Sequence, residues 1–222
     1  MKYHKLEKEP GNDFPDDIFF NLPEIQAGKD LWQNKFHQYD VLEHTQKFVE
    51  CLSEFSKDRN VRAAGWLHDI GKSIVAIPKI SKDGLVEYSI DGKKYHTFPN
   101  HEIVGEEMVK KMDPKIFKEF DLDQEKIASL VGCHYLPMKG IKVLRKSTSF
   151  HNFKIAFNHL EQVLGHMSVS QEEVLDMFIA DSLSKGMGCS DREELLLVRE
   201  TLLKNNNTDE DLLKIYQLQR KI

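Results

Sequence analysis

The side chains with the clearest chemical potential are His68 and Asp69, which are adjacent at the end of an apolar stretch closed by Gly71. Residues 61–70 predict a buried helix, and an unpaired carboxylate is costly in such a place. Imidazole and carboxylate are both good ligands for a divalent transition metal. The pair alone fits a metal site or a helix end followed by a turn, so the other histidines must decide.

Further residues of types that bind divalent metal ions lie at predicted helix ends or on buried helix faces: His44, His101, His134 and Asp181. A lone core histidine is usually structural, but helical bundles build metal sites from such inward-facing side chains on neighbouring helices. Four imidazoles favour Mn, Fe, Co, Ni or Zn over calcium, with Mg also allowed. Six ligands, two of them carboxylates, exceed what one tetrahedral centre uses. His37 precedes the first helix and is left out of the candidate site.

The composition is that of an ordinary globular protein, with enough hydrophobic residues to form a hydrophobic core. The 222 residues are 40% hydrophobic and 30% charged, which suits one domain of generous size. The net charge of -5 argues against a general nucleic-acid scaffold but leaves room for a local basic site. No apolar run has membrane-spanning length, so no membrane partner is expected. The oligomeric state is left open.

The cysteines and the first residues both indicate a cytoplasmic protein. Cys51, Cys133 and Cys189 are far apart and form no Cys-X-X-Cys pair, so a cysteine-based zinc site is not expected. The charged residues 1–10 do not resemble a signal peptide.

The periodicity predicts a mainly all-α fold with a small β-hairpin excursion near residues 74–98, where Asp-Gly pairs bracket an alternating run at 85–90. Pro137 is read as the stop of the helix that ends at His134, Ser170 is read as a capping-box residue, and Ser190 is read as the start of another helix. Helices are expected at about 41–55, 61–70, 100–112, 114–120, 124–134, 150–164, 171–184 and 209–222, with one more that residues 190–193 open.

Several motifs resemble the HD-domain superfamily of metal-dependent phosphohydrolases over residues 32–190. They are Tyr-Asp-Val-Leu-Glu-His-Thr at 39–45, Leu-His-Asp-Ile-Gly-Lys at 67–72, Phe-Pro-Asn-His-Glu at 98–102, the histidine at 134, and Asp-Ser-Leu-Ser-Lys-Gly at 181–186. The sequences of these motifs most resemble those of the HD domain in bacterial tRNA nucleotidyltransferases and poly(A) polymerases. In this chain the HD domain is expected to stand alone. Their nucleotidyltransferase motif, Gly-Ser followed by paired aspartates, is not found upstream, so CCA addition is not predicted.

The resemblance implies an all-α HD-domain bundle and a role for each ligand. His44, His68, Asp69 and Asp181 would hold one metal, and Asp69 would bridge to a second metal held by His101 and His134. Lys72, beside the ligands, is expected either to contact phosphate or to be a solvated lysine after a helix. Lys185 is a weaker candidate of the same kind. The implied domains are an N-terminal arm (1–22), the HD domain (23–190) and C-terminal helices packed on the same domain (191–222).

The implied activity is phosphoester hydrolysis by a metal-activated hydroxide, with Asp69 and Lys72 as catalytic residues. The expected substrate is a phosphorylated small molecule: a nucleotide or a cyclic phosphodiester, or else an RNA end. The alternative is an HD-fold regulatory or binding module that keeps its metals without physiological turnover. A basic cluster (Lys139, Lys142, Arg145 and Lys146) fits either a cradle for a phosphate backbone or a solvated surface.

Overall fold

The computed structural model describes residues 14–186, 191–204 and 206–220. The described residues are mainly helical, with one two-stranded antiparallel sheet, which confirms the predicted fold class. The elements are α1 (Asp16–Phe20), α2 (Pro23–Gln26), α3 (Val41–Leu52), α4 (Arg59–Leu67), α5 (Lys72–Val75), β1 (Ile77–Pro78), β2 (His96–Thr97), α6 (His101–Lys111), α7 (Pro114–Lys118), α8 (Gln124–Cys133), α9 (Leu136–Lys146), α10 (Phe150–Gly165), α11 (Gln171–Leu183), α12 (Arg192–Leu203) and α13 (Asp209–Leu218).

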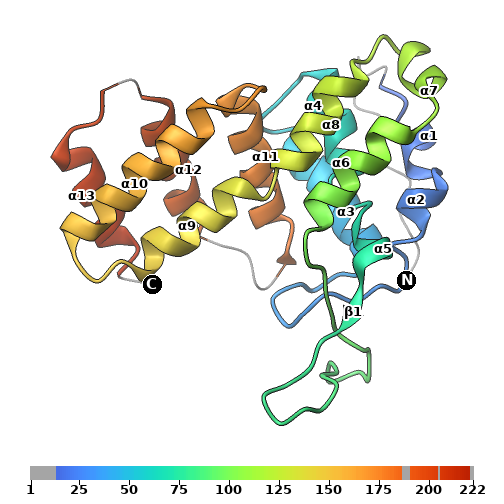
Figure 1. The fold of residues 1–222 in the computed structure, drawn as a ribbon, viewed down its shortest axis with the longest axis horizontal. Coiled ribbons are helices and arrows are strands. Elements are labelled where there is room, and N and C mark those ends of the chain that lie inside the picture. The colour runs from blue at the N-terminus through green and yellow to red at the C-terminus, as the bar shows by residue number, and fades with distance from the viewer. Residues whose placement is uncertain (1–13, 187–190, 205, 221–222) are drawn as a thin grey trace.

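The helices form two lobes that are joined by α11 (Figure 1). We call α3, α4, α6 and α8 the N-terminal lobe, and α9, α10, α12 and α13 the C-terminal lobe. Each lobe has its own apolar core, and α11 contributes to both. Val174 and Met177 pack in the first core, whereas Leu175 and Phe178 pack in the second. Because α11 is covered on both sides, it is buried continuously from Val174 to Ser182.

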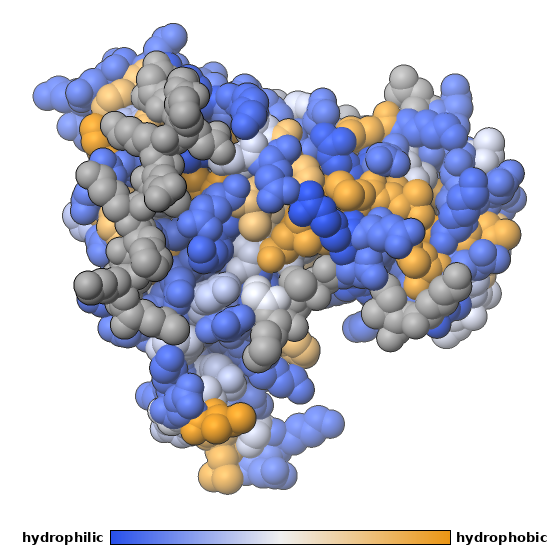
Figure 2. Space-filling model, turned by 180° about the vertical axis from the view of Figure 1, so that it is seen from behind, coloured by the Kyte–Doolittle hydropathy of each residue, from blue (hydrophilic) through white to orange (hydrophobic). Residues whose placement is uncertain are grey.

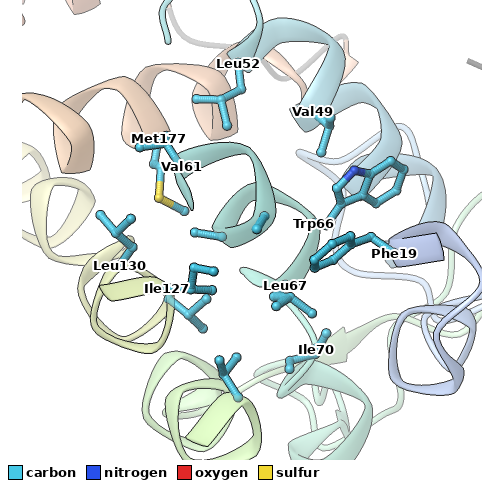
Figure 3. Packing of buried hydrophobic residues seen from close by; sticks show 14 of the residues in the cluster. Phe19, Val49, Leu52, Val61, Trp66, Leu67, Ile70, Ile127, Leu130 and Met177 are labelled. Carbon is cyan, nitrogen blue, oxygen red and sulfur yellow. The ribbon is translucent and has the colours of Figure 1, made fainter. Parts of the chain in front are cut away.

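Helix α4 lies at the centre of the N-terminal core, where the other helices surround it (Figure 3). Asp58 caps its first turn by accepting hydrogen bonds from the backbone N–H groups of Asn60 and Val61. Trp66 and Leu67 at the other end are fully buried. The helix ends at Leu67, so His68 and Asp69 enter the interior directly after it.

Gly71 allows α5 to approach the start of α6 very closely. A Cβ atom at this position would collide with the carbonyl oxygen of His101 and lie 2.7 Å from the backbone nitrogen of Gly105. Only a residue without a side chain fits here. This close contact brings the segment that carries Asp69 next to the helix that carries His101.

The part of the N-terminal arm that the structure describes is held against α4. Residues 16–20 form α1, and Asp16 binds Arg62 through two hydrogen bonds and accepts a third from Trp66 Nε1. Phe14 and Phe19 are buried, whereas Ile18 is 44% exposed and does not pin the arm. The arm is therefore fixed by an ionic contact as well as by apolar packing, and composition alone does not reveal that contact.

Pro137 does not stop helix formation, as the sequence had suggested, but lies in the first turn of α9. Proline is favoured there because its missing N–H would have no partner within the helix. The turn at residues 134–135 separates α8 from α9 instead. As a result, the basic cluster lies on a helix rather than in a loop.

Two predicted helix caps differ in detail. Ser170 precedes α11 but makes no side-chain capping bond, and Ser190 lies outside the described residues. Asp191 caps α12 by accepting hydrogen bonds from two backbone N–H groups. An aspartate next to a serine offers the same kind of acceptor, so the sequence located the helix start but not the capping atom.

Residues 74–98 form an arm that projects from the N-terminal lobe (Figures 1 and 2). β1 and β2 pair at its base, with Ile77 opposite Thr97. The predicted strand at 85–90 forms only isolated β-bridges, from Val86 to Ile80 and from Tyr88 to Lys94. Two turns of the same Ser-X-Asp-Gly type, at 81–84 and 89–92, reverse the chain within a few residues and leave little room for a regular ladder. No helix among the described residues is long and apolar enough to cross a membrane.

Candidate metal centre

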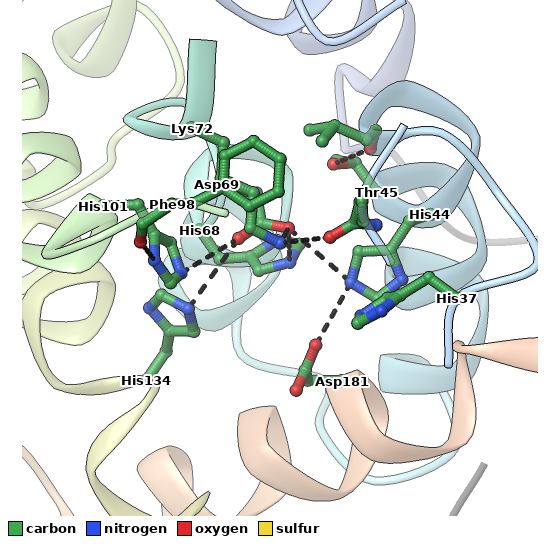
Figure 4. A network of polar contacts seen from close by, with 12 residues as sticks. His37, His44, Thr45, His68, Asp69, Lys72, Phe98, His101, His134 and Asp181 are labelled. Carbon is green, nitrogen blue, oxygen red and sulfur yellow. Dashed lines mark hydrogen bonds and ion pairs between the residues drawn. The ribbon is translucent and has the colours of Figure 1, made fainter. Parts of the chain in front are cut away.

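Asp69 lies at the centre of the site, with a set of nitrogen ligands on either side (Figure 4). Its Oδ2 atom is 3.1 Å from His68 Nε2 and 3.6 Å from His44 Nε2. Its Oδ1 atom is 3.4 Å from His101 Nε2 and 3.9 Å from His134 Nε2. The two oxygens of one carboxylate therefore face two different groups of imidazoles.

The ligands come from different helices of the N-terminal lobe. His44 lies on α3, His68 and Asp69 follow α4, His101 begins α6, and His134 follows α8. All five are buried, and the ligand atoms within each group of three lie within 4.8 Å of one another. Residues separated by up to 90 positions in the sequence thus converge on one carboxylate.

Hydrogen bonds fix the ring orientation of the histidines that follow or begin these helices. His68, His101 and His134 each donate from Nδ1 to the carbonyl oxygen three residues earlier, at distances of 2.7, 3.0 and 2.7 Å. A carbonyl can only accept, so Nδ1 carries the proton and Nε2 keeps its lone pair. All three lone pairs point toward Asp69, which is the arrangement expected of metal-binding histidines.

His44 is oriented by α11. The Ser184 hydroxyl donates to the backbone carbonyl of Asp181, so its oxygen can accept the Nδ1 proton of His44 at 3.3 Å. The Nε2 atom of His44 then faces Asp181 Oδ1 at 3.1 Å and Asp69 at 3.6 Å. Asp181 is therefore brought to the His44 and His68 side of the site, where Lys185 also binds its second oxygen at 2.9 Å.

Burial and neighbouring charges set the protonation of the site. Burial lowers the pKa of His44 and of His101, and burial together with the neighbouring imidazoles lowers the pKa of His134 to about 3. Burial by itself would raise the pKa of Asp69, but His68 and the Lys72 ammonium hold it well below its usual range. Near neutral pH, His44, His101 and His134 are thus unprotonated and the carboxylate of Asp69 is ionised, which is the state that binds metal.

The donor set fits divalent metal ions. His68 Nε2 is buried and has no hydrogen-bond partner within the described part of the chain, although it carries a lone pair. Two ligands that are each about 2.1 Å from one ion lie about 3.0–3.4 Å apart, which is close to the spacing of the Asp69 oxygens from their histidines. Bound metal would give His68 Nε2 a partner and would contact both oxygens of the Asp69 carboxylate.

The HD-domain family model matches residues 37–186 of the chain, which is most of its length. The chain belongs to the HD-domain family. No curated protein and no solved structure matches it. HD domains bind divalent metals and are generally hydrolases of the metal-dependent phosphohydrolase superfamily. The ligand groups described above all lie within the matched range of this HD domain.

Lys72 is buried in the HD domain rather than solvated. Its Nζ atom binds Asp69 Oδ2 and Gln33 Oε1, both at 2.6 Å, and lies over the ring of Phe98 at 5.4 Å. The lysine thus fixes the orientation of the central carboxylate. Its role toward a phosphate stays a prediction.

Most of the basic cluster is engaged within the protein. Lys139 binds the buried carboxylate of Glu102 at 2.6 Å, and Lys142 donates to the Tyr135 hydroxyl at 2.6 Å. Arg145 makes two hydrogen bonds to Glu194 of α12. The contacts with Glu102 and Glu194 tie α9 to α6 and α12, and together with the Tyr135 bond they reduce the positive charge that is available to a phosphate backbone.

Three residues near the centre were missed by sequence reasoning. The ring of His37 packs against that of His44 at 5.4 Å, and burial with the neighbouring His44 lowers its pKa to about 2. Glu102 Oε2 lies 3.4 Å from His101 Nδ1. Gln33 precedes the matched range and reaches Lys72. Proximity to a ligand in sequence could have indicated Glu102, but no local pattern indicates Gln33.

Proposed function

We propose that this HD domain is a metal-dependent phosphohydrolase that acts on phosphomonoesters or phosphodiesters. The expected substrates are a nucleotide, a cyclic phosphodiester or an RNA end. The single observation that supports it most is the shared carboxylate of Asp69, with oriented imidazole lone pairs on both sides. A module that only bound a partner would not need this complete and costly set of buried ligands.

In this proposal, His44, His68, Asp69 and Asp181 hold one ion, and Asp69, His101 and His134 hold a second. When bound, the ions supply a water of lowered pKa as nucleophile and withdraw charge from the phosphate that is attacked. The metal is not restricted to one element: Mn, Fe, Co, Ni and Zn all suit nitrogen and carboxylate ligands, and Mg is allowed.

The protein's own residues orient and enclose the reaction. Backbone carbonyls and Ser184 hold the imidazoles in the tautomer that leaves Nε2 free. Lys72 holds the Asp69 carboxylate in position through Oδ2. The surrounding apolar core keeps bulk water away, which strengthens the electrostatic interactions within the site.

Two further aspects belong to the same proposal. The similarity of the motifs to the HD domain of bacterial tRNA nucleotidyltransferases favours a nucleotide or RNA-end substrate among the candidates. Cys51 and Cys133 are free thiols, which favours a reducing compartment such as the cytoplasm. The competing function is a regulatory module that keeps its metals without turnover.

The test combines metal analysis with hydrolysis. The protein is purified with added manganese, cobalt or nickel, its metal is counted by elemental analysis, and a chromogenic phosphodiester is offered before a screen of nucleotides and cyclic phosphates. More than one equivalent of metal with turnover supports the proposal. Metal without turnover on any phosphoester favours the regulatory module, and a folded protein without metal contradicts both.

The ligand assignment is tested by substitution. His68→Ala should abolish hydrolysis, because His68 belongs to the group that also contains His44 and Asp181. His134→Ala should lose mainly one equivalent of metal. Equal activity in both variants would show that the site lies elsewhere.

A further inference from the structure

Two buried nitrogen atoms near Asp69 lack a hydrogen-bond partner among the residues that the structure describes. They are His68 Nε2 and Gln33 Nε2. The first carries a lone pair, because Nδ1 of the same ring donates to the Gly65 carbonyl. A metal ion satisfies it. The second nitrogen belongs to an amide and needs a different partner.

The orientation of the Gln33 amide is fixed by chemistry. One end of the amide lies 2.6 Å from Lys72 Nζ, and an ammonium group can only donate. The end that faces Lys72 must therefore be the oxygen, which leaves the NH₂ group as the unpaired end. An NH₂ group offers N–H donors and no lone pair for a cation, so its natural partner is an oxygen acceptor.

The backbone around Gln33 is held in place from several sides. The N–H group of His96 donates to the carbonyl of Gln33 at 2.9 Å, and Trp32 pairs with Asp40 in an isolated bridge. Further along the same segment, the N–H group of Gln38 donates to the carbonyl of Lys185 at 3.0 Å. Residues 31–40 therefore run along the site from Lys72 to Lys185, and Gln33 is only 2% exposed.

A short chain of contacts links this amide to the ligands. Gln33 Oε1 binds Lys72 Nζ, Lys72 Nζ binds Asp69 Oδ2, and Asp69 Oδ2 lies 3.1 Å from His68 Nε2 (Figure 4 shows the last three residues). The amide of Gln33, with its unpaired donor, is thus joined through Lys72 to the carboxylate of Asp69. Burying an N–H donor without an acceptor costs free energy, and here the donor is held at a fixed position near the candidate metal centre. This indicates that a bound ligand supplies the missing acceptor.

We propose that Gln33 is a substrate-binding residue whose Nε2 donates a hydrogen bond to a non-bridging oxygen of the reacting phosphate. This inference rests on the proposed phosphohydrolase function and adds to it a contact from outside the matched HD-domain range. Lys72 holds the amide oxygen, so the donor is already oriented when the phosphate arrives. An anion at this place also fits the nearby positive charge of Lys72.

The experiment measures binding of inorganic phosphate to the manganese-loaded protein by calorimetry. Gln33→Glu keeps an acceptor for Lys72 but removes the donor, and Gln33→Met removes both. Because a hydrogen bond to a charged group is lost, Gln33→Met should bind phosphate about 10- to 100-fold more weakly, and Gln33→Glu at least as weakly, since its carboxylate also repels the anion. Gln38→Met, a change of an exposed glutamine in the same segment, should bind it as the wild type does. Elemental analysis should show unchanged metal in all three.

A stability measurement separates binding from a structural role. Nε2 makes no hydrogen bond to the described residues, so the Tm of ligand-free Gln33→Glu should not fall below that of the wild type. A lower Tm with unchanged phosphate affinity would show that Gln33 is structural and would overturn the inference. Absence of phosphate binding in the wild type would overturn it as well.

The two proposals fail in different ways. If the loaded wild type hydrolyses phosphoesters while the Gln33 variants bind phosphate normally, only the role of Gln33 is wrong. If the wild type binds phosphate through Gln33 but hydrolyses none of the phosphoesters, the hydrolase function is wrong and the anion site stands.

Discussion

The two lobes of this protein bury carboxylates in different ways. In the C-terminal lobe, Glu194 is 1% exposed and accepts two hydrogen bonds from Arg145 and one from Gln219. In the N-terminal lobe, Asp69 is equally buried, yet it faces imidazole lone pairs beside an orphaned nitrogen.

The difference separates structural from functional burial of charge. Arg145 and Glu194 satisfy each other within the protein, so the pair links α9 to α12 without needing a ligand. Asp69 and its histidines offer several acceptors to one another, and within the described ranges Lys72 is the one ammonium group that donates to Asp69. That group becomes satisfied only when cations are added.

The largest expected effect is that of Asp69→Asn, a nearly isosteric change. One carboxylate faces both ligand groups, so its loss should remove bound metal and lower phosphoester hydrolysis by at least about 10³-fold. Elemental analysis and a chromogenic phosphodiester assay measure the two losses, and circular dichroism checks that the helices remain. Retained metal in this variant would show that Asp69 does not bridge the two groups.

The next effect concerns Asp181, which α11 brings to the site from between the lobes. Asp181→Asn should remove metal from the His44 side and lower hydrolysis about 10²-fold or more while the helix content stays the same. Asp181→Leu should be inactive yet as stable as the metal-free wild type, or more so, because the desolvation cost of a buried carboxylate is removed. Thermal unfolding with and without a chelator tests this.

The response to the chelator gives the control for Asp181. Ligand binding at about 100 times the dissociation constant adds about 2.7 kcal/mol to the unfolding free energy of the wild type, and the chelator should remove it. Asp181→Leu should respond less to the same treatment. If Asp181→Asn kept its metal and its turnover, Asp181 would be a structural residue.

Glu194→Gln applies the same carboxylate-to-amide change to the C-terminal lobe. Loss of the charged hydrogen bonds with Arg145 should lower the free energy of unfolding by about 2 kcal/mol, since the arginine remains partly solvated. Metal content and turnover should be unchanged, as measured by chemical denaturation and the two assays above. A loss of metal here would mean that the two lobes are not functionally separate.

The smallest effect is expected in the basic cluster on α9. Lys142→Met removes one hydrogen bond to the Tyr135 hydroxyl and should change KM for a phosphodiester less than about 3-fold, because exposed charges contribute little. Lys146→Met, one turn further along the same helix, is the matched control. A much larger rise in KM for Lys142→Met alone would instead indicate that this residue contacts the substrate.

The sequence by itself determined the helical class, the hairpin excursion and the family. Periodic apolar residues place helices wherever one face must be buried, and Asp-Gly pairs favour tight turns whatever surrounds them. Histidines at helix ends were also visible, because their position relative to the apolar residues is a local property. His68 and Asp69 stood out for that reason.

Only the tertiary structure decided what these residues do together. The packing of α6 against Gly71 brings His101 to Asp69, and α11 brings Asp181 to His44. The burial of Lys72 and its contact with the Gln33 amide depend on partners that are distant in the sequence. Sequence patterns report which face of an element is apolar, whereas the partner of each polar atom is set by how the elements pack.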